Sequence, residues 1–143
     1  MESKREALRD AGLLWLRILM GACIATHGYH KLFGNHFAEF EQTVAALHLP
    51  FGSPERMATI AAWSEFGGGI FVMMGLATRL AGIMIFATMS VAIFRAQWAQ
   101  AFDAKELALC YWTMAGALVL TGAGRFSIDA ALLSHFGRGG GGK

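Results

Sequence analysis

The strongest constraint on how this chain folds is that its apolar residues gather into four long stretches separated by short polar segments. The stretches run from about Gly12 to Phe33, Met57 to Ala77, Leu80 to Trp98 and Leu107 to Ala123. Each is close to the roughly 20 residues with which a helix crosses a hydrocarbon layer about 30 Å thick. The pattern predicts an all-α fold, an integral membrane bundle of four transmembrane helices.

The composition also favours a membrane setting. Charged residues make up 15% of the 143 residues, against about 25% in soluble domains. A soluble four-helix bundle is the alternative, but each of its helices needs a charged outer face, and the stretch from Ala81 to Phe94 has none. The formal charge is only +2 and is not gathered on one face, which argues against nucleic-acid binding. We therefore expect the lipid bilayer to be the main partner.

The chain is short enough to form one domain, which we expect to cover residues 1–136. The Gly-rich segment Gly137 to Lys143 is expected to be a flexible tail. Between the first two spans, apolar residues recur at helical spacing among polar ones, at Phe37, Phe40, Val44 and Leu47. This spacing predicts a short amphipathic helix that lies at the membrane interface.

The distribution of Lys and Arg predicts the orientation of the bundle. Four spans place both termini on one side, and the Lys and Arg residues of that side are Lys4, Arg5, Arg9, Arg79, Arg125, Arg138 and Lys143. Those of the other side are Lys31, Arg56, Arg95 and Lys105. Because cytoplasmic loops are enriched in Lys and Arg, we expect both termini in the cytoplasm.

Ionisable residues inside the spans are the candidates for a functional site, because charge at membrane depth is costly. They are Arg17, His27, His30 and Lys31 on the first span, Glu65 on the second and Arg95 on the third. At about 1.5 Å per residue, His27 lies about 9 Å and Glu65 about 12 Å below the outer ends of their spans. The similar depths predict that Glu65 pairs with His27 or Lys31.

The faces of the first two spans agree with such a pairing. At about 100° per residue, Arg17, His27 and Lys31 fall within an arc of about 80°. On the second span, one face carries small residues around Glu65, namely Ala58, Ala62 and Gly69. Since small residues let helices approach closely in membranes, the run Gly67–Gly69 predicts either a close helix contact or a local break beside Glu65.

Each of these charges also has a structural explanation. Arg17 can extend its side chain to the headgroups or form an ion pair, and Lys31 can reach outward as easily. The side chain of Glu65 is too short for that, so it either holds a structural partner or handles a proton or a ligand. His27 and His30 are three residues apart, but no further ligand pair accompanies them, so no metal site is expected.

Five short motifs occur in order along the chain. They are Arg17, His27-Gly28-Tyr29-His30-Lys31-Leu32-Phe33-Gly34, Glu65-Phe66-Gly67-Gly68-Gly69, Gly75-Leu76-Ala77-Thr78-Arg79-Leu80 and Gly122-Ala123-Gly124-Arg125-Phe126-Ser127-Ile128-Asp129. From about Leu14 to Leu133 the chain thereby resembles the DoxX family of small four-span bacterial membrane proteins. Ala123 is a departure, since the family often has proline there.

The resemblance implies a protein of the bacterial inner membrane that is associated with a redox system. The family's namesake resembles a subunit of a quinone-linked thiosulfate-oxidising system. The family motifs fall on residues that the depth argument also selects, namely Arg17, His27, Lys31 and Glu65. They also include Arg79, Arg125 and Asp129, which are expected at the inner surface.

The leading hypothesis is a subunit of a membrane redox system that binds a quinone or a similar apolar carrier. Arg17, His27, His30 and Lys31 are its candidate ligand-binding residues, together with Glu65, which would also handle the proton. No haem, flavin or iron–sulfur motif is evident, so we expect no intrinsic cofactor besides a possible quinone. A soluble redox enzyme would supply electrons, or a second copy would complete a homo-oligomer, and catalysis by the chain alone stays open.

Two alternatives from other functional classes remain. One is a module that binds or transports a small metabolite, with Glu65 as a proton-coupled gate. Four short spans make a full transporter improbable unless the chain oligomerises. The other is a membrane scaffold that recruits a soluble redox enzyme, in which the buried charges only hold the bundle together.

Overall fold

A computed structural model describes residues 2–50 and 52–138, and every regular element within these residues is helical. The α-helices are α1 (Glu2–Phe33), α2 (Phe37–Ala46), α3 (Pro54–Met74), α4 (Thr78–Val91), α5 (Phe102–Thr121) and α6 (Ile128–Arg138). A π-helical segment, η1 (Ala92–Ala96), continues α4. The expected all-α class is confirmed, and α2 is the short amphipathic helix expected between the first two spans.

Within residues 2–50 and 52–138, two helical segments are long and apolar enough to cross a membrane. They are α3, with a mean hydropathy of 1.3, and α4 joined to η1 over Thr78–Ala96, with 1.5. The other two expected spans are also helical and lie in α1 and α5. The first turns of α5 carry Asp103, Lys105 and Glu106, which lowers the hydropathy of that helix. The bundle of four spans therefore stays a prediction.

The two ends of the chain differ from expectation. α1 begins at Glu2 rather than near Gly12, because the residues before Gly12 are mostly strong helix formers. α6 was not expected, and it includes Gly137 and Arg138 of the segment predicted to be a flexible tail. Ser127 begins this helix by accepting a hydrogen bond from the Ala130 N–H at 3.1 Å, as N-cap residues do. Residues 139–143 of the tail lie outside the described residues.

The turn between α3 and α4 lies three residues earlier than predicted. Gly75 ends α3 with a φ of +70°, and the Leu76 N–H donates to the Phe71 carbonyl at 2.9 Å. Thr78 and Arg79, which were expected to form the turn, are the first two residues of α4. A left-handed glycine is the common way to end a helix, and it allows α3 and α4 to pack as the antiparallel pair expected from the short connection.

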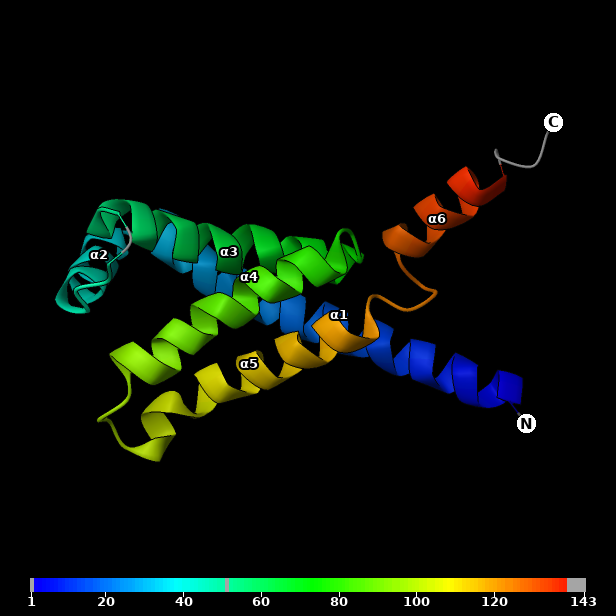
Figure 1. The fold of residues 1–143 in the computed structure, drawn as a ribbon, viewed down its shortest axis with the longest axis horizontal. Helices are drawn as coiled ribbons and strands as arrows, with labels where there is room; N and C mark the ends of the chain where they lie inside the picture. The colour runs from blue at the N-terminus through cyan, green and yellow to red at the C-terminus, as the bar shows by residue number, and fades with distance from the viewer. Residues whose placement is uncertain (1, 51, 139–143) are drawn as a thin grey trace.

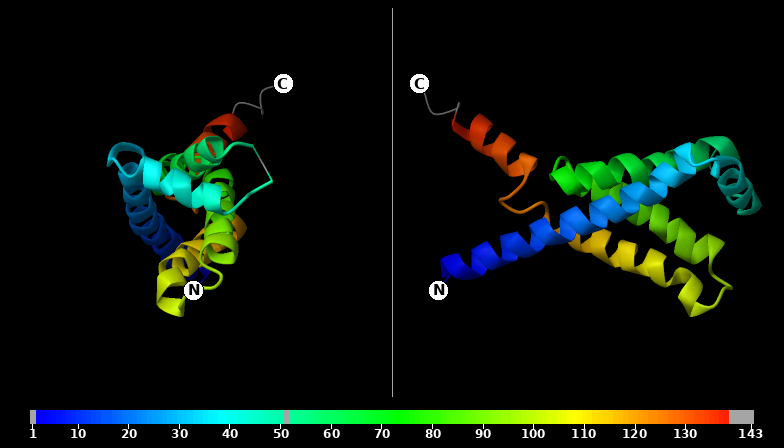
Figure 2. Two further views of the ribbon diagram at one scale, coloured as in Figure 1. Left: turned by 90° about the vertical axis from the view of Figure 1, so that its left-hand side faces the viewer. Right: turned by 180° about the vertical axis from the view of Figure 1, so that it is seen from behind.

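The helices run roughly along one long axis, with a different group of segments at each end (Figure 1). α1 packs along α3, α4 packs between α3 and α5, and α2 packs against α3. The N-terminal part of α1 and the whole of α6 project past the bundle at one end (Figure 2), which we call the terminal end. The opposite end, which holds α2 and the connection between α4 and α5, is called the α2 end.

The backbones of α1 and α3 touch at two glycines. A Cβ atom added to Gly69 would lie 2.7 Å from the Gly21 carbonyl oxygen, and one added to Gly21 would lie 2.6 Å from the Gly69 carbonyl oxygen. Both distances are too short for a real side chain. The close helix contact predicted for Gly67–Gly69 is therefore present at Gly69, whereas a local break is wrong because α3 continues to Met74.

Apolar side chains fill the space between the long helices and also cover their outer surface. The buried core includes Met20, Ile24, Val72, Ile85, Met89 and Leu118. Outside, large apolar side chains are widely exposed, such as Trp15 at 70%, Leu80 at 62% and Leu120 at 81%. An apolar outer surface of this kind on several helices fits contact with lipid rather than with water.

Candidate functional site

An ion pair between α1 and α3 forms the centre of the candidate site. Lys31 Nζ lies 2.6 Å from Glu65 Oε1 and 2.7 Å from Glu65 Oε2. The Glu65 side chain is 3% exposed and that of Lys31 is 28% exposed. Of the two partners that depth allowed for Glu65, the structure brings Lys31 to it and not His27.

The small residues of α1 and α3 explain why these two charges meet. Gly28 of α1 lies directly against the backbone of Phe66 and Ala62 of α3, so a Cβ atom at Gly28 has no room. Lys31 is three residues further along α1 and emerges on the same side of the helix. The close approach at Gly28 therefore brings the Lys31 side chain to Glu65, which lies beside Phe66 in the sequence.

The amphipathic helix α2 covers the ion pair. Lys31 Nζ lies 4.3 Å from the centre of the Phe40 ring, a distance at which a cation is attracted to the face of an aromatic ring. Val44, one turn further along α2, is buried. The apolar face predicted for residues 37–47 thus packs onto α3 and onto Lys31.

A cavity of about 310 Å³ lies beside the ion pair and is lined mainly by α2, α3, α4 and η1, with Lys31 contributed by α1. Among the described residues that line it, Lys31 and Glu65 are the two charged ones. The other side chains are mostly apolar and include Phe40, Leu47, Met57, Ile60, Met84 and Val91. The cavity is therefore largely apolar, and its charged groups are the Lys31–Glu65 ion pair.

Three hydroxyl groups also line the cavity, and each donates its proton within its own helix. Thr43 donates to the Glu39 carbonyl at 3.0 Å. Ser64 donates to the Ile60 carbonyl at 2.7 Å, and Thr88 donates to the Met84 carbonyl at 3.0 Å. These hydroxyl oxygens keep their capacity to accept a hydrogen bond from a ligand.

The end of α4 changes to a π-helix where it passes the cavity. Gln97 N–H donates to the Ala92 carbonyl at 2.9 Å, and both Ala92 and Ala96 line the cavity. Arg95 of this segment donates from Nη2 to the Leu47 carbonyl at 3.3 Å, which ties η1 to the end of α2. π-Helical turns inside α-helices occur frequently at functional sites. No feature of the apolar run from Leu80 to Trp98 indicated this change.

The two histidines of α1 lie outside the cavity. His27 is exposed, and its ring packs edge-on against that of Tyr111 with 5.8 Å between the ring centres. His30 is also exposed, with its ring 5.9 Å from that of Tyr29. Tyr111 is only 6% exposed and was not singled out, because one aromatic residue in an apolar stretch carries no signal of its own.

Arg17 belongs to a different part of the molecule from Lys31 and Glu65. It is 1% exposed, and its guanidinium donates from Nη1 to the Ala123 carbonyl at 2.7 Å and from Nη2 to the Phe126 carbonyl. Two structural roles were expected for Arg17, but its side chain is buried inside the protein rather than extended outward, and it forms no ion pair with the residues that the structure describes. At about 1.5 Å per residue, Arg17 and Lys31 are about 21 Å apart along α1.

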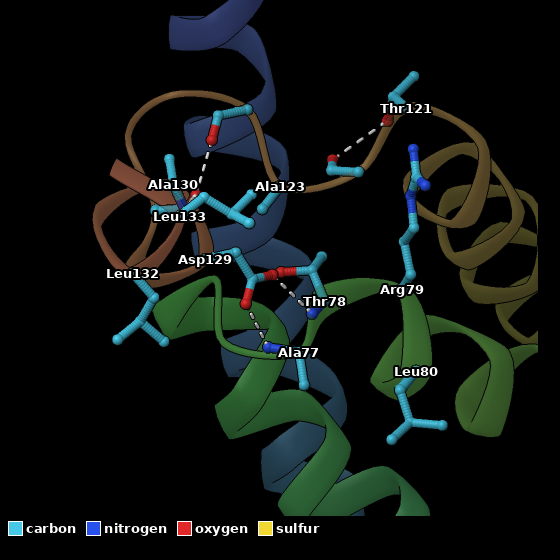
Figure 3. A pocket seen from close by; sticks show the side chains of 13 residues that line it. Ala77, Thr78, Arg79, Leu80, Thr121, Ala123, Asp129, Ala130, Leu132 and Leu133 are labelled. Carbon is cyan, nitrogen blue, oxygen red and sulfur yellow. Dashed lines mark hydrogen bonds between the residues drawn. The ribbon is translucent and has the colours of Figure 1, made fainter. Parts of the chain in front are cut away.

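The remaining motif residues lie at the terminal end. Asp129 accepts hydrogen bonds from the Ala77 N–H at 2.7 Å and the Thr78 N–H at 3.0 Å (Figure 3). A carboxylate at the N-terminus of α4 is also favoured by the helix dipole. Arg79 and Arg125 are exposed, and the Arg125 guanidinium lies 5.8 Å from the centre of the Phe126 ring.

Sequence reasoning also missed Asp10, which is 4% exposed and lies beside Gly124. It sits in the polar first turns of α1, where a carboxylate normally faces water, so its burial could not be foreseen. Across residues 2–50 and 52–138, no three His, Cys, Asp or Glu side chains come together as metal ligands.

Comparison with known proteins relates the chain to membrane proteins. The DoxX family model matches residues 12–98, which include every residue that lines the 310 Å³ cavity. The chain is 30% identical over 129 residues to the "Inner membrane protein YqjF" of Escherichia coli (strain K12), a match that covers 87% of this chain and 95% of that protein.

A second relative matches a shorter part of the chain. It is the "Putative oxidoreductase CatD" of Bacillus subtilis (strain 168), 34% identical over 84 residues, which cover 59% of this chain and 58% of that protein. No solved structure matches the chain. On the family model and the long match to the Escherichia coli protein, the chain belongs to the DoxX family of membrane proteins.

Proposed function

We propose that this DoxX-family protein is a subunit of a membrane redox system and binds a quinone, or a similar apolar redox carrier, in the cavity beside Lys31 and Glu65. The observation that carries the proposal is one ion pair, with a buried carboxylate, in the wall of an otherwise uncharged cavity of about 310 Å³. Ligand pockets typically combine apolar walls with a few polar groups that orient the ligand. Ionisable residues at membrane depth are also functional candidates, because a charge in the hydrocarbon region costs free energy.

The two charged groups have complementary capacities toward such a carrier. Lys31 Nζ carries three N–H donors, so it can hold Glu65 and still donate a hydrogen bond to a carbonyl oxygen. Glu65 can accept and release a proton. Reduction of a quinone to a quinol consumes two electrons and two protons, and Glu65 would pass the protons while Lys31 keeps the carbonyl oxygen in place.

The electrons would come from a soluble redox enzyme partner, and a second copy of the chain in a homo-oligomer is the other assembly we consider. The name of the Bacillus subtilis relative contains the word oxidoreductase, which supports a redox setting for this chain. His27, His30 and Arg17 do not line the cavity, so we propose no contact between them and the carrier.

The membrane arrangement that goes with this function has four spans, in α1, α3, α4 with η1, and α5. α2 then lies at one membrane surface, and both termini lie in the cytoplasm. The name of the Escherichia coli relative supports the bacterial inner membrane as the location. Residues 1–136 would form this single membrane domain.

Quinone binding to purified protein tests the proposal. The wild type, Glu65→Gln and the control Glu55→Gln, which changes an exposed carboxylate on the same helix, are reconstituted in nanodiscs. They are titrated with a short-chain benzoquinone and a short-chain naphthoquinone while tryptophan fluorescence is recorded. We expect saturable binding to the wild type and Glu55→Gln, and binding about tenfold weaker for Glu65→Gln, because a hydrogen-bonded charge is lost.

Two results would contradict the proposal. One is a wild type that binds neither quinone. The other is a folded Glu65→Gln protein that binds as tightly as Glu55→Gln, which would leave the ion pair with a structural role only, as in a membrane scaffold.

A further inference from the structure

A second and larger cavity, of about 610 Å³, lies at the terminal end of the molecule. It is bounded by the start of α4, the end of α5, the loop that follows α5, and α6 (Figure 3). The loop is held in place by the two hydrogen bonds from Arg17 to the carbonyls of Ala123 and Phe126. α6 is tied to the start of α4 by Asp129. Two charged side chains therefore hold the walls of the cavity, Arg17 as a hydrogen-bond donor and Asp129 as an acceptor.

Among the described residues that line the cavity, one cation makes no hydrogen bond or ion pair. Arg79 and Asp129 are the charged side chains among the described lining residues. Both carboxylate oxygens of Asp129 already accept backbone N–H groups. Within residues 2–50 and 52–138, no hydrogen bond or ion pair joins Arg79 to another group. Its side chain extends away from Asp129 toward the loop after α5 (Figure 3).

A hydroxyl group in the same wall also lacks a partner. Thr78 is fully buried and lines the cavity, and its Oγ1 has no hydrogen-bond partner among residues 2–50 and 52–138. A buried polar group without a partner costs free energy. Thr78 therefore adds an unsatisfied polar group to the wall beside Arg79, although its hydroxyl is not itself exposed to the cavity.

The other side of the cavity is apolar and open. Leu80 is 62% exposed, Leu132 is 43% exposed and Leu133 is 75% exposed, and all three line the cavity.

The position of Arg79 along α4 places it near a membrane surface. The apolar segment Thr78–Ala96, which is long enough to cross a membrane, begins one residue before it. Arg79 is the second residue of that segment, so it lies at the level of the lipid headgroups when the segment spans the bilayer.

We infer that this cavity binds an anionic phospholipid, with the phosphate on the Arg79 guanidinium and an acyl chain along Leu80, Leu132 and Leu133. A guanidinium matches the geometry of a phosphate with two parallel N–H donors. We take the headgroup to be net anionic because Arg79 makes no hydrogen bond or ion pair within residues 2–50 and 52–138, whereas the Asp129 carboxylate already accepts two backbone N–H groups. This inference is independent of the quinone proposal, since the two cavities share no lining residue.

Lipid binding to delipidated protein in detergent tests the inference. Phosphatidylglycerol or phosphatidylcholine is added to the wild type, Arg79→Gln and Arg79→Lys, and bound lipid is counted by native mass spectrometry. The matched control is Arg125→Gln, which removes an exposed cation at the same end that does not line the cavity. Folding of each variant is checked by its thermal unfolding in the same detergent.

We expect phosphatidylglycerol to bind the wild type and Arg125→Gln equally, and both more tightly than phosphatidylcholine. Arg79→Gln should bind it about tenfold more weakly, because one charge-assisted contact is lost. Arg79→Lys should retain a preference for phosphatidylglycerol over phosphatidylcholine. Leu132→Asn should weaken binding of the lipid without removing that preference.

Three outcomes would overturn the inference. The first is equal binding of phosphatidylglycerol to folded Arg79→Gln and to the wild type. The second is an equal loss in Arg125→Gln, which would mean attraction to the whole charged end rather than to a site. The third is displacement of the lipid by inorganic phosphate at the same concentration, which would mean that the cavity takes a free anion and gains nothing from the acyl chain.

Discussion

Lys31 and Glu65 are 34 positions apart in the sequence and join α1 to α3 through contacts of 2.6 and 2.7 Å. The pair is buried on the Glu65 side, covered by Phe40 of α2, and open toward a cavity of about 310 Å³. Its structural effect and its proposed role in binding can be separated by experiment.

Removal of one partner of this pair should destabilise the protein more than removal of both. Lys31→Gln leaves the carboxylate of Glu65 buried without its cation, and a change of this kind costs about 3 kcal/mol. In the double variant Lys31→Gln, Glu65→Gln, two neutral amides can hydrogen-bond, so part of that loss should be recovered. Thermal or denaturant unfolding in detergent measures the difference. If the double variant lost as much free energy of unfolding as the two single variants together, Lys31 and Glu65 would not stabilise each other.

Arg17 should stabilise the terminal end without influencing the cavity beside Glu65. Arg17→Leu removes the donors for the Ala123 and Phe126 carbonyls, and we expect a loss of about 2–4 kcal/mol. Hydrogen exchange should become faster in residues 122–129. Quinone binding should remain within about twofold of the wild type, because Arg17 lies about 21 Å from Lys31 along α1. A large loss of quinone binding in a folded Arg17→Leu protein would contradict this separation.

The contact between Gly21 and Gly69 should tolerate no side chain. Gly69→Ala would place its Cβ 2.7 Å from the Gly21 carbonyl oxygen, so α1 and α3 must move apart, at a cost of about 1–3 kcal/mol. Gly67→Ala is the matched control, since its Cβ would meet nothing closer than Trp63 at 3.9 Å. That variant should be neutral or up to about 1 kcal/mol more stable, because alanine is the better helix former. Equal unfolding temperatures for the two variants would argue against the close contact.

Asp129 should act as the cap of α4. Asp129→Ala removes the acceptor for the N–H groups of Ala77 and Thr78, and we expect the protein to lose about 1–2 kcal/mol. Asp129→Asn keeps one side-chain oxygen and should lose less. Unfolding measurements on both variants test this, and a smaller loss for alanine than for asparagine would be inconsistent with capping.

The helices and the candidate partners of Glu65 could be predicted because both depend on the length of apolar stretches and on the spacing of residues along single helices. Apolar stretches of about 20 residues define the long helices, and the spacing of Phe37, Phe40 and Val44 defines α2. The rise per residue places His27 and Glu65 at similar depth, which gave His27 and Lys31, one turn further along α1, as the candidate partners of Glu65. The choice between His27 and Lys31 depended on where Gly28 lets α1 approach α3. The spacing of residues along one helix does not show where a second helix touches it.

The terminal end could not be predicted in the same way. Gly122 and Gly124 have φ values of +77° and +73°, and they turn the chain so that the Ala123 and Phe126 carbonyls face Arg17. Which backbone carbonyls are free to accept from a buried arginine depends on this turn and not on any spacing in the sequence. The angular spacing grouped Arg17, His27 and Lys31 on one face of the first span, but it could not show that the partners of Arg17 and Lys31 lie at different ends of the molecule.

Photo-crosslinking with an azido-quinone measures directly where an apolar carrier binds. The reagent is bound to the protein in nanodiscs and illuminated, and the labelled peptides are identified by mass spectrometry. The account predicts labels at Lys31 and within residues 40–65 and 84–96, which together include every residue that lines the cavity. It also predicts a marked loss of label in Glu65→Gln but not in Glu55→Gln. Labels confined to the terminal end, or spread evenly over the outer surface in all three proteins, would contradict it.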